Sequence, residues 1–131
     1  MAFQFDLVAP ERAMVSNEAT LVTAPGVEGD FGVMEGHAPL LSTLRPGVVT
    51  ATYADGSEHR FVVFGGLAEV GPDHCAILAE EVHKFEELEP HTLQQRIADA
   101  EAELQTGDHD DIHRRAQKLN DLRSLQMLHK V

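Results

Sequence analysis

Apolar and polar positions alternate along the first part of the chain. Phe3, Phe5 and Leu7 are separated by polar residues, which is the period-two pattern of a half-buried strand. Further short apolar runs, "ATLVTAPG", "GVVTATY", "RFVVFGG", "LAEV" and "HCAILA", are bounded by Pro-Gly, "ADGS" and "GPD" turn signals. Many short strands with close turns predict an antiparallel β-sandwich or barrel domain over residues 1–86.

The period changes to that of a helix in the remaining residues, 87–131. Between Leu93 and Leu104 apolar residues recur every three or four positions, so they share one helical face. Two residues compete to mark the start of this helix. Pro90 suits the first turn, where its missing N–H costs little, and Thr92 with Gln95 offers a capping box.

A polar break, "TGDHDD", separates this helix from a second one. Gly107 is expected to end the first helix, and Asp110 or Asp111 to cap the second. The apolar residues of the second helix fall near one face: Ile112, Ala116, Leu119, Leu122 and Leu125. Because the link is short, the two helices are predicted to be antiparallel neighbours, forming a helical hairpin.

The charge balance excludes some classes of partner. Ten basic and 22 acidic residues give a formal net charge of −12, which disfavours nucleic-acid binding and direct attachment to anionic lipid. The N-terminal "MAFQFDLVAP" has no signal-peptide pattern, and no apolar run reaches the roughly 20 residues of a membrane helix. The single cysteine, Cys75, lies in an apolar run and is expected to be a buried core residue.

Two features of the sequence resemble enzyme sites. "HDDIH" places His109 and His113 four residues apart, as in a zinc motif, but a third ligand is missing and the aspartates are better explained as helix caps. His37 has Asp30 and Glu35 nearby and resembles an acid–base pair, yet no serine or cysteine lies in a nucleophile elbow. A free-standing β-sandwich hydrolase or metalloenzyme using His37 or His109/His113 is therefore the alternative function.

One long stretch, "VAPERAMVSNEATLVTAPGVEGDFGVMEGHAPLLSTLRPG", resembles the N-terminal domain of the epsilon subunit of bacterial F-type ATP synthases, called delta in mitochondria. The core of the match is "EGDFGVMEGHAPLLSTLRPG", and "FGGLAEVGPDHCAILAEE" supports it. One difference is Glu35, where proline is common in the family. The resemblance implies a flattened sandwich of two five-stranded sheets followed by an antiparallel two-helix hairpin.

The resemblance also implies a function. The subunit is a noncatalytic part of the central rotor, whose β domain grips the gamma subunit and rests on the ring of c subunits, coupling proton flow to ATP synthesis. It implies a peripheral location on the cytoplasmic side of the inner membrane, within the complex. The residues at the positions of the gamma and c-ring contact are Asp30, Glu35, His37, Pro39 and Leu40.

The hairpin carries a second implied role. In several bacterial relatives it extends towards the alpha/beta catalytic head and inhibits ATP hydrolysis through basic residues of its last helix. The residues here that suit this role are Arg114, Arg115, Lys118 and Arg123. Some relatives bind ATP through an Ile/Leu-Asp-x-x-Arg-Ala motif, but in "DIHRRA" Ile112 stands where the aspartate belongs. We therefore expect no cofactor and no metal.

Overall fold

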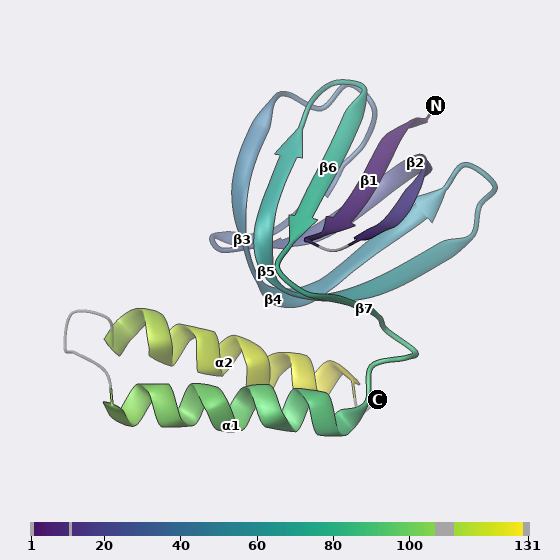
Figure 1. Ribbon diagram of the computed structural model, residues 1–131. Coiled ribbons are helices and arrows are strands. Elements are labelled where there is room, and N and C mark those ends of the chain that lie inside the picture. The colour runs from purple at the N-terminus through teal and green to yellow at the C-terminus, as the bar shows by residue number, and fades with distance from the viewer. Residues whose placement is uncertain (1, 11, 107–111, 130–131) are drawn as a thin grey trace. The chain divides into compact units, whose positions relative to one another are not determined.

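The computed structural model describes residues 2–10, 12–106 and 112–129 (Figure 1). The chain divides into two compact units, Met1–Lys84 and Phe85–Val131. The first unit contains the strands β1 (Phe3–Ala9), β2 (Arg12–Gly26), β3 (Gly29–Val33), β4 (Leu40–Tyr53), β5 (Glu58–Val70), β6 (His74–Ala79) and β7 (Val82–Lys84). The second contains the helices α1 (Pro90–Thr106) and α2 (Ile112–His129).

The described strands build two layers of five from seven strands, because β2, β4 and β5 each contribute to both. The first layer consists of β3, β2, β4, β5 and β7, and the second of β2, β1, β6, β5 and β4. β2 changes layers at Ala19, which pairs with both Phe3 and Tyr53. The predicted β-sandwich followed by two helices is confirmed. The expected antiparallel order has one exception among these strands, since β1 and β6 pair in parallel.

The change of layer in β5 takes place at Gly65 and Gly66. Both have positive φ values, 117° and 144°, which residues other than glycine rarely adopt. The pair lies at the point where β5 leaves β7 and begins to pair with β6. "RFVVFGG" and "LAEV" were expected as separate strands. That expectation was wrong, because the glycines bend one continuous strand instead of ending it.

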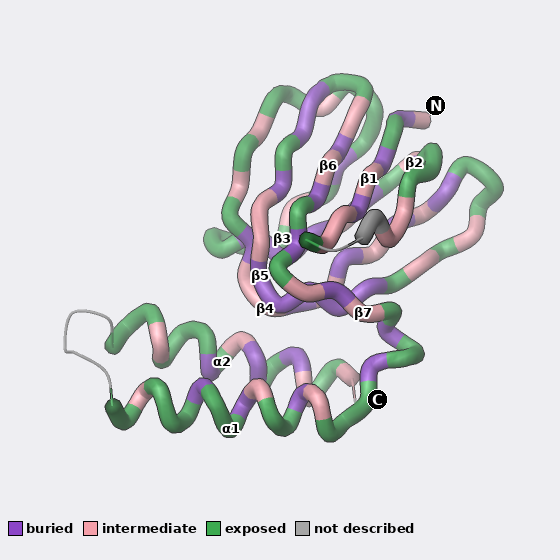
Figure 2. Tube along the Cα trace, in the orientation of Figure 1, coloured by how far each residue is buried: buried purple, intermediate pink, exposed green. Residues whose placement is uncertain are grey.

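The interior between the layers is apolar throughout the described part of the unit. Phe3, Phe5 and Leu7 are all buried, as their alternation predicted, and they pack in one cluster with Cys75 and Ile77 of β6. Buried and more exposed positions alternate along β1 (Figure 2). Burial, with a smaller contribution from the nearby Asp6 carboxylate, raises the pKa of the Cys75 thiol to about 11. Cys75 is thus a core residue, as expected.

The helical hairpin begins at Pro90, so the first of the two predicted starts is correct. Thr92 lies inside the first turn, where its N–H donates to the carbonyl of Glu89 at 3.0 Å. The buried residues of the hairpin helices are Leu93, Ile97 and Ala100 of α1, and Leu119, Leu122 and Leu125 of α2.

The apolar face predicted for the second helix is only partly buried. Ile112 and Ala116 are exposed, because the buried stripe of α2 begins at Leu119. The predicted caps at Gly107, Asp110 and Asp111 lie outside the described residues. Neither described helix is long and apolar enough to cross a membrane.

Candidate functional site

The segment 34–39, between β3 and β4, contains a tight turn. The N–H of His37 donates to the carbonyl of Met34 at 3.1 Å, and Gly36 has φ of 84°. Positive φ at the third residue of a hydrogen-bonded turn is the requirement of type II, which glycine meets without strain. Glu35 occupies the second position of this turn, where proline is favoured because its ring fixes the required φ.

This turn is anchored to another loop that is distant in sequence. The N–H of Gly36 donates to the carbonyl of Pro72 at 2.7 Å, so segment 34–39 and the β5–β6 turn lie at the same end of the sandwich (Figure 1). The next residue, Asp73, accepts a hydrogen bond from the N–H of Gln4 at 3.0 Å. Three chain segments therefore hold this end together through their backbones.

His37 is half-buried in this arrangement. Its Nδ1 lies 2.6 Å from the carbonyl oxygen of its neighbour Ala38, so the ring is oriented by its own loop. Among the residues that the structure describes, the hydrogen-bond partner of the ring is this carbonyl and not a carboxylate. A base that activates a nucleophile needs the nucleophile within hydrogen-bond reach, and this geometry offers a held, partly exposed polar side chain instead.

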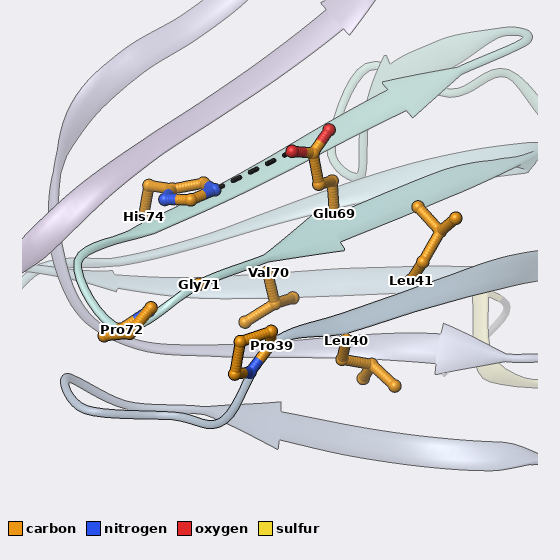
Figure 3. A pocket seen from close by; sticks show the side chains of 8 residues that line it. All are labelled: Pro39, Leu40, Leu41, Glu69, Val70, Gly71, Pro72 and His74. Carbon is orange, nitrogen blue, oxygen red and sulfur yellow. Dashed lines mark ion pairs between the residues drawn. The ribbon is translucent and has the colours of Figure 1, made fainter.

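An open groove of about 540 Å³, which we call the end groove, lies beside this loop (Figure 3). Its wall is largely apolar, and Leu41 is 66% exposed there. His74 carries the polar side of the groove. Its Nε2 is 4.0 Å from Oε1 of Glu69, and its Nδ1 is 3.1 Å from Oδ1 of Asp73. The residues lining the end groove are Pro39, Leu40, Leu41, Glu69, Val70, Gly71, Pro72 and His74.

The structure gathers four of the five predicted contact residues and separates the fifth. Glu35, His37, Pro39 and Leu40 all lie in or directly after segment 34–39, which follows the last residue of β3. Asp30 lies near the first residue of β3, opposite Pro25 of β2.

The carboxylate of Asp30 has a partner within the unit. It forms an ion pair with the guanidinium of Arg45, which also donates to the carbonyl of Gly26. The Asp30 side chain is nevertheless 73% exposed. It therefore holds the β2–β3 turn against β4 and keeps acceptor capacity on its solvent side.

Three of the four predicted basic residues of the hairpin contact α1. Arg123 Nη2 lies 3.3 Å from Oε1 of Glu101, and Lys118 Nζ lies 3.9 Å from Oε2 of Glu103. Arg115 donates to the backbone carbonyl of Glu103 at 3.0 Å. Arg114 is exposed at the start of α2. Three of the four predicted basic side chains thus lie against α1, which carries the acidic residues Glu101 and Glu103.

The enzyme-like features do not assemble into a reactive centre in the described residues. These residues contain no group of three His, Cys, Asp or Glu that could hold a metal. His113 is exposed on α2, and its proposed partner His109 lies outside the described residues.

A serine and a histidine do meet in the β4–β5 turn. Ser57 Oγ is 2.9 Å from His59 Nε2 and donates to Asp55 Oδ1 at 2.6 Å. This hydrogen bond, together with a second one from the Ser57 N–H to Asp55 Oδ1 at 2.9 Å, lowers the pKa of Asp55. The hydroxyl proton is therefore directed at the carboxylate and not at the imidazole, and the His59 ring stacks on Tyr53 at 4.1 Å. The arrangement orders a turn and does not activate a nucleophile.

Some residues at this end were not predicted from the sequence. Met34 and Leu41 are exposed apolar side chains, and Glu69, Pro72 and His74 reach the site only because β5 and β6 return to it. The composition of "GPDH" indicates a turn. That this turn lies beside segment 34–39 follows only from the tertiary pairing of the strands.

The β unit matches a known family over nearly its whole length. The family described as "ATP synthase, Delta/Epsilon chain, beta-sandwich domain" matches residues 2–85. The ATP synthase epsilon chain of Agrobacterium fabrum is 45% identical over 112 residues, covering 86% of this chain and 82% of that protein. The epsilon chain of Mesorhizobium japonicum is 40% identical over 126 residues, covering 95% and 93% of the two chains.

Solved structures share the fold. A chain in the cryo-EM structure of the Euglena gracilis mitochondrial ATP synthase, OSCP/F1/c-ring, superposes with a TM-score of 0.76 at 22% identity, covering 97% of this chain and 81% of that one. A chain in the central stalk/c-ring structure of the Tetrahymena thermophila enzyme gives 0.57 at 16% identity, covering 66% and 69%. The alternative of a free-standing hydrolase or metalloenzyme finds no support in these matches. The family match and the identities over most of the chain show that this protein belongs to the ATP synthase epsilon chain family.

Proposed function

We propose that the β-sandwich unit is the joint of the rotor, holding the gamma subunit and resting on the c-ring. As an ATP synthase epsilon chain, the protein is a noncatalytic subunit of that complex. The single observation that carries the proposal is the 40% sequence identity with the epsilon chain of Mesorhizobium japonicum over 95% of this chain. The structures that share its fold are an OSCP/F1/c-ring assembly and a central stalk/c-ring assembly, which supports a place in the rotor beside the c-ring.

The end of the sandwich built from segment 34–39 suits a joint. Its turn is fixed by hydrogen bonds from His37 to Met34 and from Gly36 to Pro72, so a contact there loses little conformational entropy. We assign to the contact with the c-ring and gamma the residues Asp30, Glu35, His37, Pro39 and Leu40. Since Asp30 lies at the far end of β3, it contacts a different part of the partners from the other four.

The hairpin, residues 87–131, is proposed as a regulatory element that inhibits ATP hydrolysis when it extends to the alpha/beta head. In that posture Arg114, Arg115, Lys118 and Arg123 pair with acidic groups of the head. In the closed hairpin, the pairs of Lys118 and Arg123 with α1 are about half exposed. Exposed pairs of this kind contribute only about 0.2–1 kcal/mol each, so they oppose opening weakly.

The burial of the leucines of α2 opposes opening much more strongly. Leu119, Leu122 and Leu125 are each at most 5% exposed, and exposing one such side chain costs roughly 1.5–3 kcal/mol. Three of them outweigh the two ion pairs several-fold. An extended hairpin must therefore find apolar contacts as well as acidic ones along its partners, because charge alone does not offset this loss.

The proposed location follows from the assembly. The chain is part of the ATP synthase complex, which places it peripherally at the membrane. We propose that it lies on the cytoplasmic side of the inner membrane, where the catalytic head of a bacterial enzyme faces the cytoplasm.

The test is reconstitution of an ATP synthase stripped of this subunit. The full chain or a truncation ending at Glu86 is added back, and association with gamma, proton-coupled ATP synthesis and ATP hydrolysis are measured. We expect both proteins to associate and restore coupling, and only the full chain to suppress hydrolysis. If both associate and hydrolysis is the same, the hairpin is not a brake. If neither associates, the rotor role of the sandwich is wrong.

A further inference from the structure

The last residue of α2, His129, contacts the segment that precedes α1. Its Nε2 lies 3.1 Å from the backbone carbonyl oxygen of Phe85, 44 residues earlier in the chain. Because a carbonyl oxygen only accepts, the imidazole nitrogen is the donor of this hydrogen bond. The two rings also contact each other, with centroids 5.1 Å apart and planes inclined at 60°. We call these two contacts between Phe85 and His129 the clasp.

The clasp lies at the end of the hairpin where the helices are not joined. Residues 107–111 connect the two helices at one end, and Phe85 and His129 lie at the other (Figure 1). The ion pair of Lys118 with Glu103, by contrast, lies close to the joined end of α1. Two helices joined at one end separate first at the other, because the connection limits how far the joined ends can move apart. The clasp therefore holds the end from which opening begins.

Phe85 is well placed to anchor the end of α2. It directly follows β7, whose last residue, Lys84, pairs with Phe61 of β5. The side chain of Phe85 is only 9% exposed, and that of Leu88, which also precedes α1, is 3% exposed. The segment between β7 and α1 is thus held by buried apolar side chains. Since His129 is hydrogen-bonded to this segment, α2 cannot leave α1 without breaking the clasp.

We propose that the clasp between His129 and Phe85 controls the opening of the hairpin and so limits the inhibition of ATP hydrolysis. The inference rests on the proposed function, which supplies the inhibitory extended posture. The basic residues assigned to that posture do not include His129, so removing its side chain destabilises the closed hairpin alone. Loss of one such hydrogen bond changes an equilibrium by about three- to tenfold, and the open hairpin should become more populated by this factor.

The sign of the effect separates this role from a purely structural one. If the clasp restrains the brake, its loss should strengthen inhibition, because the extended posture forms more often. If the clasp only maintained the fold of the hairpin, its loss would weaken inhibition, because a damaged hairpin cannot act on the catalytic head.

The first measurement is hydrogen exchange of the isolated full chain by mass spectrometry, on peptides that cover the last turns of α2. In His129→Ala these amides should exchange about three- to tenfold faster than in the wild type. Alanine is the better helix former, so faster exchange does not reflect a lower helix propensity. The matched control is Met127→Ala, which removes a 72% exposed side chain from the same turn and should stay within about twofold of the wild type.

The second measurement is ATP hydrolysis by an ATP synthase stripped of this subunit and then reconstituted. The proteins added back are the wild type, His129→Ala, Met127→Ala and the truncation ending at Glu86, which defines the uninhibited rate. With His129→Ala the ratio of inhibited to active enzyme should rise about three- to tenfold over the wild type. Met127→Ala should match the wild type.

The two measurements together distinguish failure of the inference from failure of the proposed function. If His129→Ala exchanges like Met127→Ala, the clasp does not hold the open end and the inference is wrong. If exchange is faster but inhibition is equal to or weaker than that of the wild type, the regulatory role of the clasp is wrong while the brake stands. If the wild type and the truncation give equal hydrolysis, the hairpin is not a brake, and the inference fails together with the proposed function.

Discussion

Gly66 allows β5 to pass from one layer of the sandwich to the other, and replacing it with alanine should be strongly destabilising. Its φ of 144° is a conformation that only glycine adopts readily. A Cβ atom there would lie 2.3 Å from the carbonyl oxygen of Leu78 and 2.9 Å from Cα of Ala79. Both atoms belong to the backbone of β6, so they cannot move away without disturbing the β5–β6 ladder.

The magnitude has two parts. Holding a residue with a side chain in such a backbone region costs roughly 1–3 kcal/mol. Forcing extra volume into a packed site costs about 1–3 kcal/mol more. The expected loss of unfolding free energy is therefore about 2–6 kcal/mol, a large share of the roughly 5–15 kcal/mol that stabilises a typical domain. In urea this corresponds to a midpoint lower by roughly 1–3 M.

The assay can observe the sandwich alone. Tyr53 of β4 is the single tyrosine and the chain has no tryptophan, so tyrosine emission during urea unfolding reports this unit. Two glycine-to-alanine variants separate strain from collision. Gly29 has a φ of 137° with nothing within 4 Å of a Cβ, whereas Gly32 has no positive φ and its nearest atom, Leu21 Cδ1, is at 3.8 Å.

The expected order of stability is Gly32→Ala, close to the wild type or above it, then Gly29→Ala, then Gly66→Ala. Gly29→Ala should lose only the strain term, about 1–3 kcal/mol. If Gly66→Ala unfolds at the same urea concentration as Gly29→Ala, the close approach to β6 does not demand glycine. If it matches Gly32→Ala, the account of the β5 bend is wrong altogether.

Three further changes test other parts of the structure. Glu35→Pro should raise the thermal midpoint of the sandwich by about 2–8 °C, because proline suits the second position of the type II turn. Glu35→Ala controls for the lost charge. A lower midpoint for the proline variant would contradict the turn geometry. Burial raises the pKa of Cys75 to about 11, above the value of 9.0 for the unfolded thiol. The unfolding free energy should therefore be constant near neutral pH and fall as the pH rises above 9.0. Urea unfolding at neutral pH and above pH 9.0 checks this, and Cys75→Ala should lose the decrease that the thiol causes. Leu122→Ala, at a site 1% exposed, should cost the hairpin about 2–5 kcal/mol by far-UV helical ellipticity, while Met127→Ala, 72% exposed, should stay within about 0.5 kcal/mol of the wild type.

The sequence predicted correctly those strands and turns that are determined by neighbouring residues. The alternation of Phe3, Phe5 and Leu7 identified β1, and the Asp55-Gly56 turn was correct because Gly56 adopts a φ of 88° and Tyr53 and Ser57 close the hairpin at 2.8 Å. Gly65-Gly66 has equally strong turn chemistry, yet there the chain bends and continues. The residues around Gly65-Gly66 do not indicate that β6 pairs with β5 after the glycines, and this pairing keeps the strand extended.

The candidate site divides in the same way. The family resemblance implied that His37 is a contact residue, and the structure holds it half-buried in the turn of segment 34–39. Its neighbours were missed because Pro72 and His74 come into reach only through the pairing of β5 with β6. The resemblance grouped Asp30 with His37 as contact residues, but the extended strand β3 places them at its opposite ends. The contacts of Lys118 and Arg123 with α1 depend on the closed hairpin and have no local signature.

The layer-switching strands also bear on the proposed role as a rotor joint. The β4–β5 ladder runs from the pair Leu40–Val70, at the end groove, to the pair Thr52–Glu58, beside the far hairpin turn. At Arg45 and Gly65–Gly66 the ladder passes from one layer to the other, and β4 and β5 stay paired on both sides of this point. A torque applied at the end groove is therefore carried along hydrogen bonds into the whole unit, and not across the apolar interior alone. Two independent sheets joined only by side-chain packing would shear more easily. The bend at Gly66 is thus a requirement of stiffness as well as of folding, and a variant that folds but relaxes this bend should couple rotation less well than one altered in the turn at Gly29.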